Sequence, residues 1–258
     1  LGRESTIFLH LTLVPALHKA GEIKTKPTQH SVKELRSIGI QPDIVLCRAH
    51  DPLPADARRK ISLFTNVDEA SVISAEDVDN IYSIPRRYHE QGLDEAVVRH
   101  LALGGDESNL AEWDRVVEVM GSPEAELTIA MVGKYVSLTE SYKSLSEAII
   151  HAGIQNHVRP VVKYVDAEDL TSTEKAAEVL ADVDAVLVPG GFGERGTEGM
   201  INAVRFARTS GTPYLGICLG LQIAVIEFAR HVAGMKTANS TEFDETGEFP
   251  VVALVTEW

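Results

Sequence analysis

The feature that most constrains this chain is the segment 213–222, in which a cysteine stands between two glycines, as Gly216-Ile-Cys218-Leu-Gly220. The apolar run after Pro213 predicts a buried strand, and apolar residues recur at helical spacing after Gly220. Glycines on both sides of the cysteine leave room for a sharp turn, because they carry no side chains that would crowd it. The segment therefore predicts a strand, a tight elbow at Cys218 and a helix.

Cys218 at such an elbow would stand at a helix N-terminus, whose partial positive charge favours the thiolate over the thiol. A nucleophile presented between a strand and a helix is the nucleophile-elbow arrangement, here with sulfur in place of a serine oxygen. A buried structural cysteine is the alternative, but it would not need both glycines and an apolar strand before them. We therefore predict that Cys218 is a catalytic nucleophile and that Cys47 is an inert core residue.

Composition limits the functions that the chain can have. Its two cysteines lie far apart and form no disulfide framework, which favours a reducing, cytoplasmic compartment. The net charge of -14 argues against nonspecific binding of nucleic acid or anionic membranes, although a local cluster of cations can still bind an anion. No apolar run is long enough to span a bilayer. The chain begins at Leu1 and ends just after an apolar strand, so we expect both ends to be truncated.

Apolar spacing predicts alternating strands and helices in two stretches joined by a linker at 122–126, where helix breakers and charges concentrate. Alternation with short loops predicts an α/β fold of two doubly wound parallel-sheet domains, Rossmann-like or flavodoxin-like and both incomplete, at 1–121 and 127–258. The expected strands run towards Pro15 and over 44–47, 72–74, 127–132, 161–165, 184–188 and the segment before the elbow; the expected helices cover 32–37, 55–60, 110–120, 140–152, 172–180 and 197–209, with further helices around Gly92.

A second glycine-rich segment, 189–193, follows the predicted strand 185–188 and reads Pro-Gly-Gly-Phe-Gly. Its backbone N–H groups, with that of Leu219, could form an oxyanion hole beside the nucleophile. The loops 133–135 and 189–196 and the Cys218 elbow would share one edge of the sheet, since parallel strands gather ligands at their carboxyl ends.

The first stretch contains two lysines that could bind phosphate. Pro27 is expected to hold Lys26 extended, and alternation would then send Lys24 and Lys26 to the same side. Ser31 and Glu34 have the spacing of a capping box that opens the next helix. Two ammonium groups would thus precede a helix N-terminus, which suits phosphate oxygens. On spacing alone, a solvated loop with two lysines is equally consistent.

Residues 189–191 and 216–222 resemble the class I glutamine amidotransferases, which release ammonia from glutamine, and the resemblance covers 127–258. It implies Cys218 as the nucleophile and the N–H groups of Gly191 and Leu219 as oxyanion donors. It also implies that glutamine is contacted by Gly191, Leu219, Gly220, Leu221, Gln222 and Glu242.

That family uses a His-Glu pair well downstream of the nucleophile, and this chain ends before reaching it. His231 lies 13 residues along the nucleophile's own helix, which at about 1.5 Å per residue is roughly 20 Å from the thiol. It is expected to complement the helix C-terminus instead. His151 and His157 flank the end of another predicted helix and are expected at the surface.

Residues 21–35 and 37–43 resemble the pyrimidine-nucleotide segment of the CTP synthase family, and 189–196 and 238–243 match that family's form of the second domain. Members aminate UTP to CTP with ATP, Mg²⁺ and glutamine-derived ammonia, through a UTP phosphorylated at O4. The resemblance implies a cytoplasmic homotetramer of pyrimidine biosynthesis that is inhibited by CTP and activated by GTP.

The same resemblance assigns nucleotide contacts. It implies UTP or CTP contacts at Lys24, Thr25, Lys26, Pro27, Thr28, Gln29 and Lys60, and ATP contacts at Arg48, Glu76, Asp77 and Val78. Arg195, on the loop after the oxyanion glycines, is the candidate for the response to GTP. The family's phosphate-binding loop and magnesium ligands would lie upstream of Leu1.

Two other functions stay open. The chain could be the glutaminase part of another amidotransferase, such as GMP synthase, although a bare glutaminase has no use for a triphosphate clamp at 24–29. It could also be a non-catalytic fragment that binds nucleotide and keeps the fold without turnover. Selective reaction of Cys218 with a glutamine-like electrophile would separate an enzyme from such a fragment.

Overall fold

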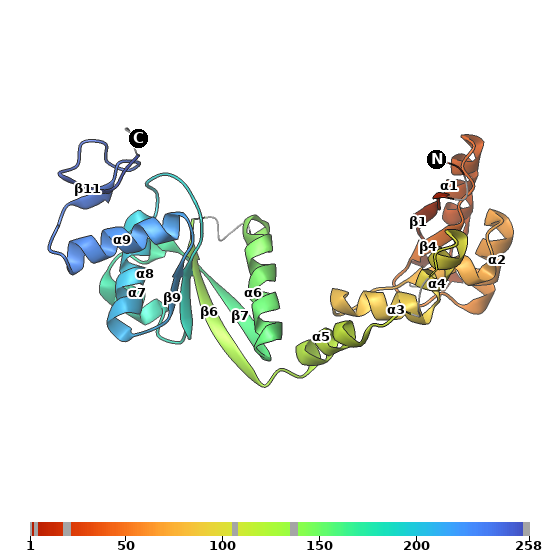
Figure 1. The fold of residues 1–258 in the computed structure, drawn as a ribbon, viewed down its shortest axis with the longest axis horizontal. Coiled ribbons are helices and arrows are strands. Elements are labelled where there is room, and N and C mark those ends of the chain that lie inside the picture. Colours follow the sequence, from red (N-terminus) through yellow and green to blue (C-terminus); the bar gives the residue numbers. More distant parts are fainter. Residues whose placement is uncertain (1, 3–4, 18–21, 105–107, 135–138, 255–258) are drawn as a thin grey trace. The chain divides into compact units, whose positions relative to one another are not determined.

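The computed structural model describes residues 2, 5–17, 22–104, 108–134 and 139–254. The chain divides into two compact units, Leu1–Glu118 and Val119–Trp258, which are described separately below (Figure 1). Residues 122–124 of the predicted linker connect helix α5 (Ala111–Gly121) to strand β6 (Ala125–Gly133), so the strand begins two residues earlier than predicted.

Unit 1 is built around a parallel sheet in the order β1 (Leu9–Leu13), β4 (Ile44–Arg48), β5 (Val72–Ala75). Helices α1 (Lys26–Ser37) and α2 (Ala55–Thr65) contribute Val32 and Ile61 to the core on one face of this sheet. Helix α4 (Leu93–His100) covers Ile44 and Ile73 on the other face, with α3 (Ile84–Glu90) beside it. A short antiparallel pair, β2 (Ala16–Leu17) and β3 (Glu22–Ile23), precedes α1.

Helix α1 corrects the prediction for the lysine segment. It begins at Lys26, six residues before the predicted start, so Lys26 is not extended and the capping box was wrong. Pro27 explains the difference, because proline is well suited to the first helical turn, where its missing N–H removes no intrahelical bond. The Ser31 hydroxyl is hydrogen-bonded to His10 Nε2 at 2.8 Å and caps nothing.

Unit 2 contains a four-stranded parallel sheet in the order β7 (Val158–Asp166), β6, β8 (Ala185–Val188), β9 (Tyr214–Gly216). Helix α6 (Lys143–Gln155) packs on one face, and the larger core forms with α7 (Thr173–Val179), α8 (Thr197–Ser210) and α9 (Leu219–His231). A small parallel pair, β10 (Ala238–Ser240) and β11 (Phe249–Val252), packs on α9. This is the predicted doubly wound arrangement, with the strand order reversing beside β6.

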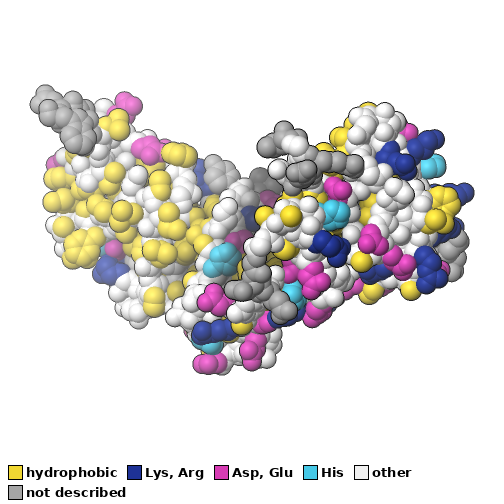
Figure 2. Space-filling model, turned by 45° about the vertical axis from the view of Figure 1, so that its right-hand side comes forward, with side chains coloured by type: hydrophobic (Ala, Val, Ile, Leu, Met, Phe, Trp, Pro, Cys, Tyr) yellow, Lys and Arg dark blue, Asp and Glu magenta, His cyan; other side chains and the backbone are white. Residues whose placement is uncertain are grey.

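Hydrophobic side chains gather on the visible surface of unit 2, at the left of Figure 2. Exposed large apolar residues of this unit include Leu215 at the end strand and Leu221, Val225 and Phe228 along α9. Apolar surface of this extent is typical of a face that another segment or partner covers. No described helix is long and apolar enough to cross a membrane.

Candidate active site

The elbow at Cys218 is a strained backbone feature. Cys218 precedes α9 with φ 53° and ψ -104°, a region that residues with side chains rarely occupy. A Cβ on Gly216 would lie 2.5 Å from the Gly220 carbonyl, and one on Gly220 would lie 2.1 Å from the Val188 oxygen. Both glycines are therefore required by close backbone approach, as the sequence pattern indicated.

Hydrogen bonds hold the elbow in this conformation. The Ile217 N–H donates to the Val188 oxygen at 3.0 Å, which ties the elbow to the end of β8. The Tyr214 hydroxyl donates to the Gly220 oxygen at 2.7 Å, and burial raises the pKa of Tyr214, so it stays a donor. Sequence reasoning had given Tyr214 no role beyond the strand.

The two cysteines have opposite environments. The Cys218 side chain is exposed, and Cys218 is the N-cap residue of α9, at the positive end of the helix dipole. Cys47 is fully buried in β4, and burial raises the pKa of its thiol to about 12. Cys47 is thus protonated and inert, as predicted, and the elbow thiol is open to solvent.

The glycine loop after β8 lies directly against the elbow. A Cβ on Gly190 would lie 3.6 Å from the Cys218 Cβ, and one on Gly191 would lie 3.2 Å from the Leu219 Cδ2. Among the described residues, the backbone N–H groups of Gly191 and Leu219 donate to no protein acceptor. Two unpaired donors next to an exposed thiol are what an oxyanion site requires.

The remaining residues predicted to contact glutamine lie around this loop. The Gly193 N–H donates to Glu242 Oε1 at 2.7 Å, so Glu242 closes the loop from one side. The Gln222 Oε1 is buried, and within the described part of the chain no donor reaches it. A buried acceptor without a donor costs free energy, so a ligand N–H would find a partner there. Leu221 is exposed, whereas Leu219 and Gly220 are buried.

None of the histidines considered in the sequence serves the thiol. His231 Nδ1 lies 3.1 Å from the Glu227 oxygen in the last turn of α9, at the end opposite to Cys218. His151 lies in the second half of α6 and His157 just beyond that helix, which returns towards the amino ends of the strands. The structure thus agrees with the sequence in leaving Cys218 without a histidine from these three.

Lys134, outside the glycine loop, and Arg195, within the loop 189–196, fix this loop through polar contacts. The Lys134 ammonium donates to the Phe192 oxygen at 3.0 Å and also to the Gly193 oxygen. Arg195 donates to the Lys134 oxygen at 2.7 Å and pairs with Glu168 at 3.0 Å. Sequence reasoning had placed 133–135 at this edge but had assigned Lys134 no role.

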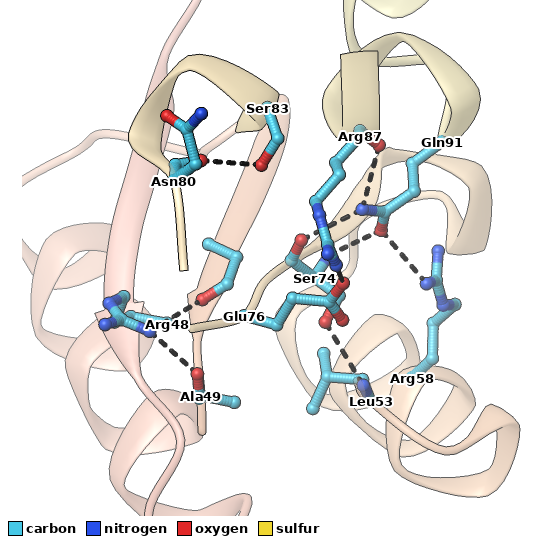
Figure 3. Close-up of polar contacts among 11 residues, drawn as sticks. Arg48, Ala49, Leu53, Arg58, Ser74, Glu76, Asn80, Ser83, Arg87 and Gln91 are labelled. Atoms are coloured by element: carbon cyan, nitrogen blue, oxygen red, sulfur yellow. Dashed lines mark hydrogen bonds and ion pairs between the residues drawn. The ribbon is translucent and has the colours of Figure 1, made fainter. Parts of the chain in front are cut away.

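In unit 1, a hollow of about 340 Å³ lies at the carboxyl ends of β1 and β4, lined by Leu13, Val14, Pro15, Ala16, Arg48, Ala49, His50 and Asp77. It contains two of the residues predicted to bind ATP. Arg48 donates to the Ala49 oxygen at 2.8 Å and to the Ala75 oxygen at 3.2 Å (Figure 3). It also pairs with Asp77. Of the other two residues predicted to bind ATP, Glu76 pairs with Arg87, and Val78 is half-buried.

The edge of β5 that leads to this hollow is held by Gln91 and Arg58, neither of which sequence reasoning identified. The Ser74 N–H donates to Gln91 Oε1 at 2.8 Å, and Gln91 Nε2 donates to the Ser74 oxygen at 2.9 Å (Figure 3). Arg58 donates to the Val72 oxygen at 2.8 Å. β5 is an edge strand, and the side chains of Gln91 and Arg58 bind backbone groups of β5 that a neighbouring strand would otherwise bind. A larger hollow, about 750 Å³, lies beside this edge, but two of its arginines, Arg86 and Arg87, already pair with carboxylates.

The lysine segment lies next to the smaller hollow, because the Lys24 N–H donates to the oxygen of Pro15 at 2.9 Å. Thr25 and Thr28 are buried, and the Thr28 hydroxyl donates to the Leu13 oxygen at 3.4 Å. Their side chains therefore support the segment from inside and present no surface to a nucleotide. Lys26 and Pro27 are exposed, Lys24 and Gln29 are half-buried, and Lys60 is exposed on α2, which packs on α1.

The fold and the elbow define unit 2 as a glutamine amidotransferase domain. Residues 137–249 match the family model of the class-I glutamine amidotransferases. A solved structure described as the glutaminase domain of Trypanosoma brucei CTPS with bound acivicin is 39% identical in sequence, over 50% of this chain and 50% of that chain, with a TM-score of 0.48. The chain thus spans half the length of that solved domain.

The family match of unit 1 shows which kind of amidotransferase the chain resembles. Residues 1–103 match the family model of the CTP synthase N-terminus. The chain thus has a CTP synthase N-terminus followed by a class-I amidotransferase domain, and it belongs to the CTP synthase family.

A magnesium ion would need several oxygen ligands that converge on one point. Within the described ranges, no group of three or more His, Cys, Asp or Glu side chains converges in a way that could hold a metal ion. The described residues therefore do not fit a magnesium site of their own.

Proposed function

We propose that this chain is part of an enzyme that aminates UTP to CTP, using ATP and ammonia released from glutamine. The observation that carries the proposal is the exposed Cys218 thiol on a strained elbow beside the glycine loop, where the N–H groups of Gly191 and Leu219 have no protein acceptor among the described residues. The match to the CTP synthase N-terminus supports this reaction over that of another glutamine-dependent synthetase.

In the glutaminase step, the Cys218 thiolate would attack the side-chain amide carbon of glutamine. The carbonyl oxygen becomes an oxyanion held by the Gly191 and Leu219 N–H groups. Collapse of this intermediate breaks the C–N bond, ammonia leaves with a proton from a general acid, and a thioester remains that water hydrolyses to glutamate. The family resemblance supplies the acid from a His-Glu pair, and we assign that part to no residue of this chain.

In the synthetase step, O4 of UTP would take a phosphoryl group from ATP, and ammonia would then displace phosphate from C4. The lysine segment around Lys24 borders the hollow that holds Arg48 and Asp77, which supports neighbouring sites for the two nucleotides. Arg48 can stack on a purine, and Lys24 and Lys26 suit a polyphosphate. Mg²⁺ would accompany ATP with ligands from other residues. Regulation by CTP and GTP, with Arg195 in the GTP response, and assembly as a cytoplasmic homotetramer belong to the same proposal.

Labelling of the two cysteines tests the glutaminase assignment. Acivicin, which the Trypanosoma brucei structure holds, should modify Cys218 and leave Cys47 untouched, as measured by peptide mass spectrometry of the native protein. Equal or absent modification of both thiols in folded protein would favour a non-catalytic nucleotide-binding fragment.

Substitution of the lysines tests the nucleotide assignment. Lys24→Ala should weaken protection of unit 1 by UTP against proteolysis or thermal unfolding, because one ammonium would be missing from the clamp. Lys33→Ala is the matched control, since Lys33 is an exposed lysine of α1 outside the predicted contacts. If UTP protects the Lys24 variant as well as the Lys33 variant, the clamp assignment is wrong.

A further inference from the structure

The glycine loop 189–193 has little hydrophobic packing around Phe192 and Gly193, at the end away from β8. Phe192, in the middle of the loop, is 80% exposed, and Gly193 takes φ 75°, which side-chain residues avoid. The position of this end must therefore come from polar contacts. Lys134 and Glu242 make these polar contacts, and both side chains bind the backbone of Gly193.

Lys134 and Glu242 hold Gly193 from its two polar groups. The Lys134 ammonium donates to the Gly193 oxygen and, at 3.0 Å, to the Phe192 oxygen. The Glu242 carboxylate accepts the Gly193 N–H at 2.7 Å. Opposite charges thus meet the opposite ends of the backbone dipoles, which is the favourable arrangement for charge-assisted hydrogen bonds.

Lys134 has been taken out of water to make these contacts. Only 5% of the residue is exposed, and burial lowers the pKa of its ammonium, with the Glu242 carboxylate opposing that change. Long side chains of lysine ordinarily keep the ammonium in solvent, so burial requires compensating partners. Its own backbone is fixed as well, because Lys134 directly follows β6 and its oxygen accepts from Arg195.

These contacts matter for the two N–H groups beside Cys218. The Leu219 N–H belongs to α9 and is fixed by the helix, whereas the Gly191 N–H belongs to the loop, one residue before the Phe192 carbonyl that Lys134 holds. Oxyanion donors act only when they are held close to the productive geometry, within about 0.5 Å. We propose that Lys134 is a positioning residue for glutamine hydrolysis, which aims the Gly191 N–H at the oxyanion by holding the Phe192 and Gly193 carbonyls.

Two electrophiles that differ in their need for the oxyanion site test this inference, which rests on the proposed glutaminase function. A chloroketone analogue of glutamine adds the Cys218 thiolate to its ketone carbon, forms an oxyanion and then loses chloride. Iodoacetamide loses iodide in a single displacement at a saturated carbon and forms no oxyanion. The ratio of the two rates at Cys218, measured on the native chain by mass spectrometry, therefore reports oxyanion stabilisation separately from thiol reactivity.

Lys134→Met removes the charge and keeps the length of the side chain. It should slow the chloroketone reaction about tenfold or more, less than the ~100-fold loss of a whole donor, and leave the iodoacetamide rate unchanged. Lys134→Arg restores donors and should recover part of the loss. Lys175→Met, at an exposed lysine paired with Glu178 on α7, is the matched control and should change neither rate.

The outcomes distinguish failure of the positioning role of Lys134 from failure of the proposed glutaminase function. An unchanged rate ratio in folded Lys134→Met overturns the positioning role while leaving the glutaminase proposal intact. If the unaltered protein shows no preference of the chloroketone for Cys218 over Cys47, the proposed function itself fails. Should Lys134→Met not fold, Lys134→Gln keeps one uncharged donor, and the same rate ratio in that variant decides the question.

Discussion

The elbow of unit 2 and the β5 edge of unit 1 are two sites built on opposite principles. At the elbow the chemistry lies in the backbone, since a strained turn presents Cys218 and the glycine loop packs beside it. At the β5 edge the backbone is regular, and the side chains of Arg58, Gln91 and Arg48 arrange it. A site of the first kind can be recognised in the sequence by its glycines, because only glycine fits there. A site of the second kind cannot, because residues such as glutamine and arginine occur in many other environments.

The largest expected effect is at the elbow and follows from backbone contact alone. Gly220→Ala would place a Cβ 2.1 Å from the Val188 oxygen, which is backbone and cannot move aside cheaply. We expect complete loss of the selective reaction of Cys218 with the glutamine analogue, even where the rest of unit 2 stays folded by circular dichroism. Gly121→Ala, at the last residue of α5 with open space around it, is the control. Normal labelling of the Gly220 variant would show that the elbow tolerates a side chain.

An ion pair in unit 2 has one buried member, the Glu227 carboxylate, and a partly exposed partner, Arg208. Arg208 donates two hydrogen bonds, at 2.9 and 2.8 Å, to the buried Glu227 carboxylate, joining α8 to α9. Arg208→Met would leave that carboxylate buried and without its main partner, at a cost of about 3–5 kcal/mol in the free energy of unfolding measured with urea. Replacing both residues by methionine should cost less than Arg208→Met alone. A double variant that is the less stable of the two would contradict this account.

The next prediction concerns the β5 edge. Gln91→Leu keeps the size of the side chain but removes both partners of the Ser74 backbone, which should lower the free energy of unfolding by about 1–3 kcal/mol. Amide hydrogen exchange at Ser74 should accelerate. The proposed ATP site should also bind ATP more weakly, because this strand leads to Asp77. The elbow in unit 2 should label normally. Glu90→Leu, at an exposed neighbouring residue on α3, is the matched control; equal exchange rates in the two variants would deny Gln91 this role.

The same contrast explains what could be predicted from the sequence. The two parallel sheets, the elbow, the glycine loop and the inert Cys47 were accessible because apolar periodicity and glycine spacing are local signals. The start of α1 was not, since Pro27 is compatible both with an extended residue before it and with a first helical turn. Gln91 and Lys134 lie 17 and 58 residues from the backbone groups they hold, and no spacing rule connects positions so far apart.

The smallest expected effect concerns His50, where the hollow of unit 1 could respond to pH. Hydrogen bonding to the Asp77 carboxylate, and then the charge of Asp51, raise the pKa of His50 above 6.5, with Arg48 opposing. The same bond, with that from Arg48, lowers the pKa of Asp77 below 3.8. Protonated His50 therefore stabilises unit 1 fully below pH 6.5, and the contribution is lost as pH rises through the raised value. The Asp77 contribution is present above pH 3.8 and is lost as pH falls through the lowered value.

A titration of the His50 imidazole by NMR checks this assignment residue by residue. Asp77→Asn should lower the pKa of His50 more than Asp51→Asn does, because only Asp77 makes the hydrogen bond and Asp51 acts through its charge alone. The effect on stability should be small, since the pair is exposed to solvent and screened by salt. Equal shifts in the two variants would mean that general negative charge, and not the contact with Asp77, sets the pKa of His50. The pH response would then be a property of the exposed surface and not of the hollow beside Arg48.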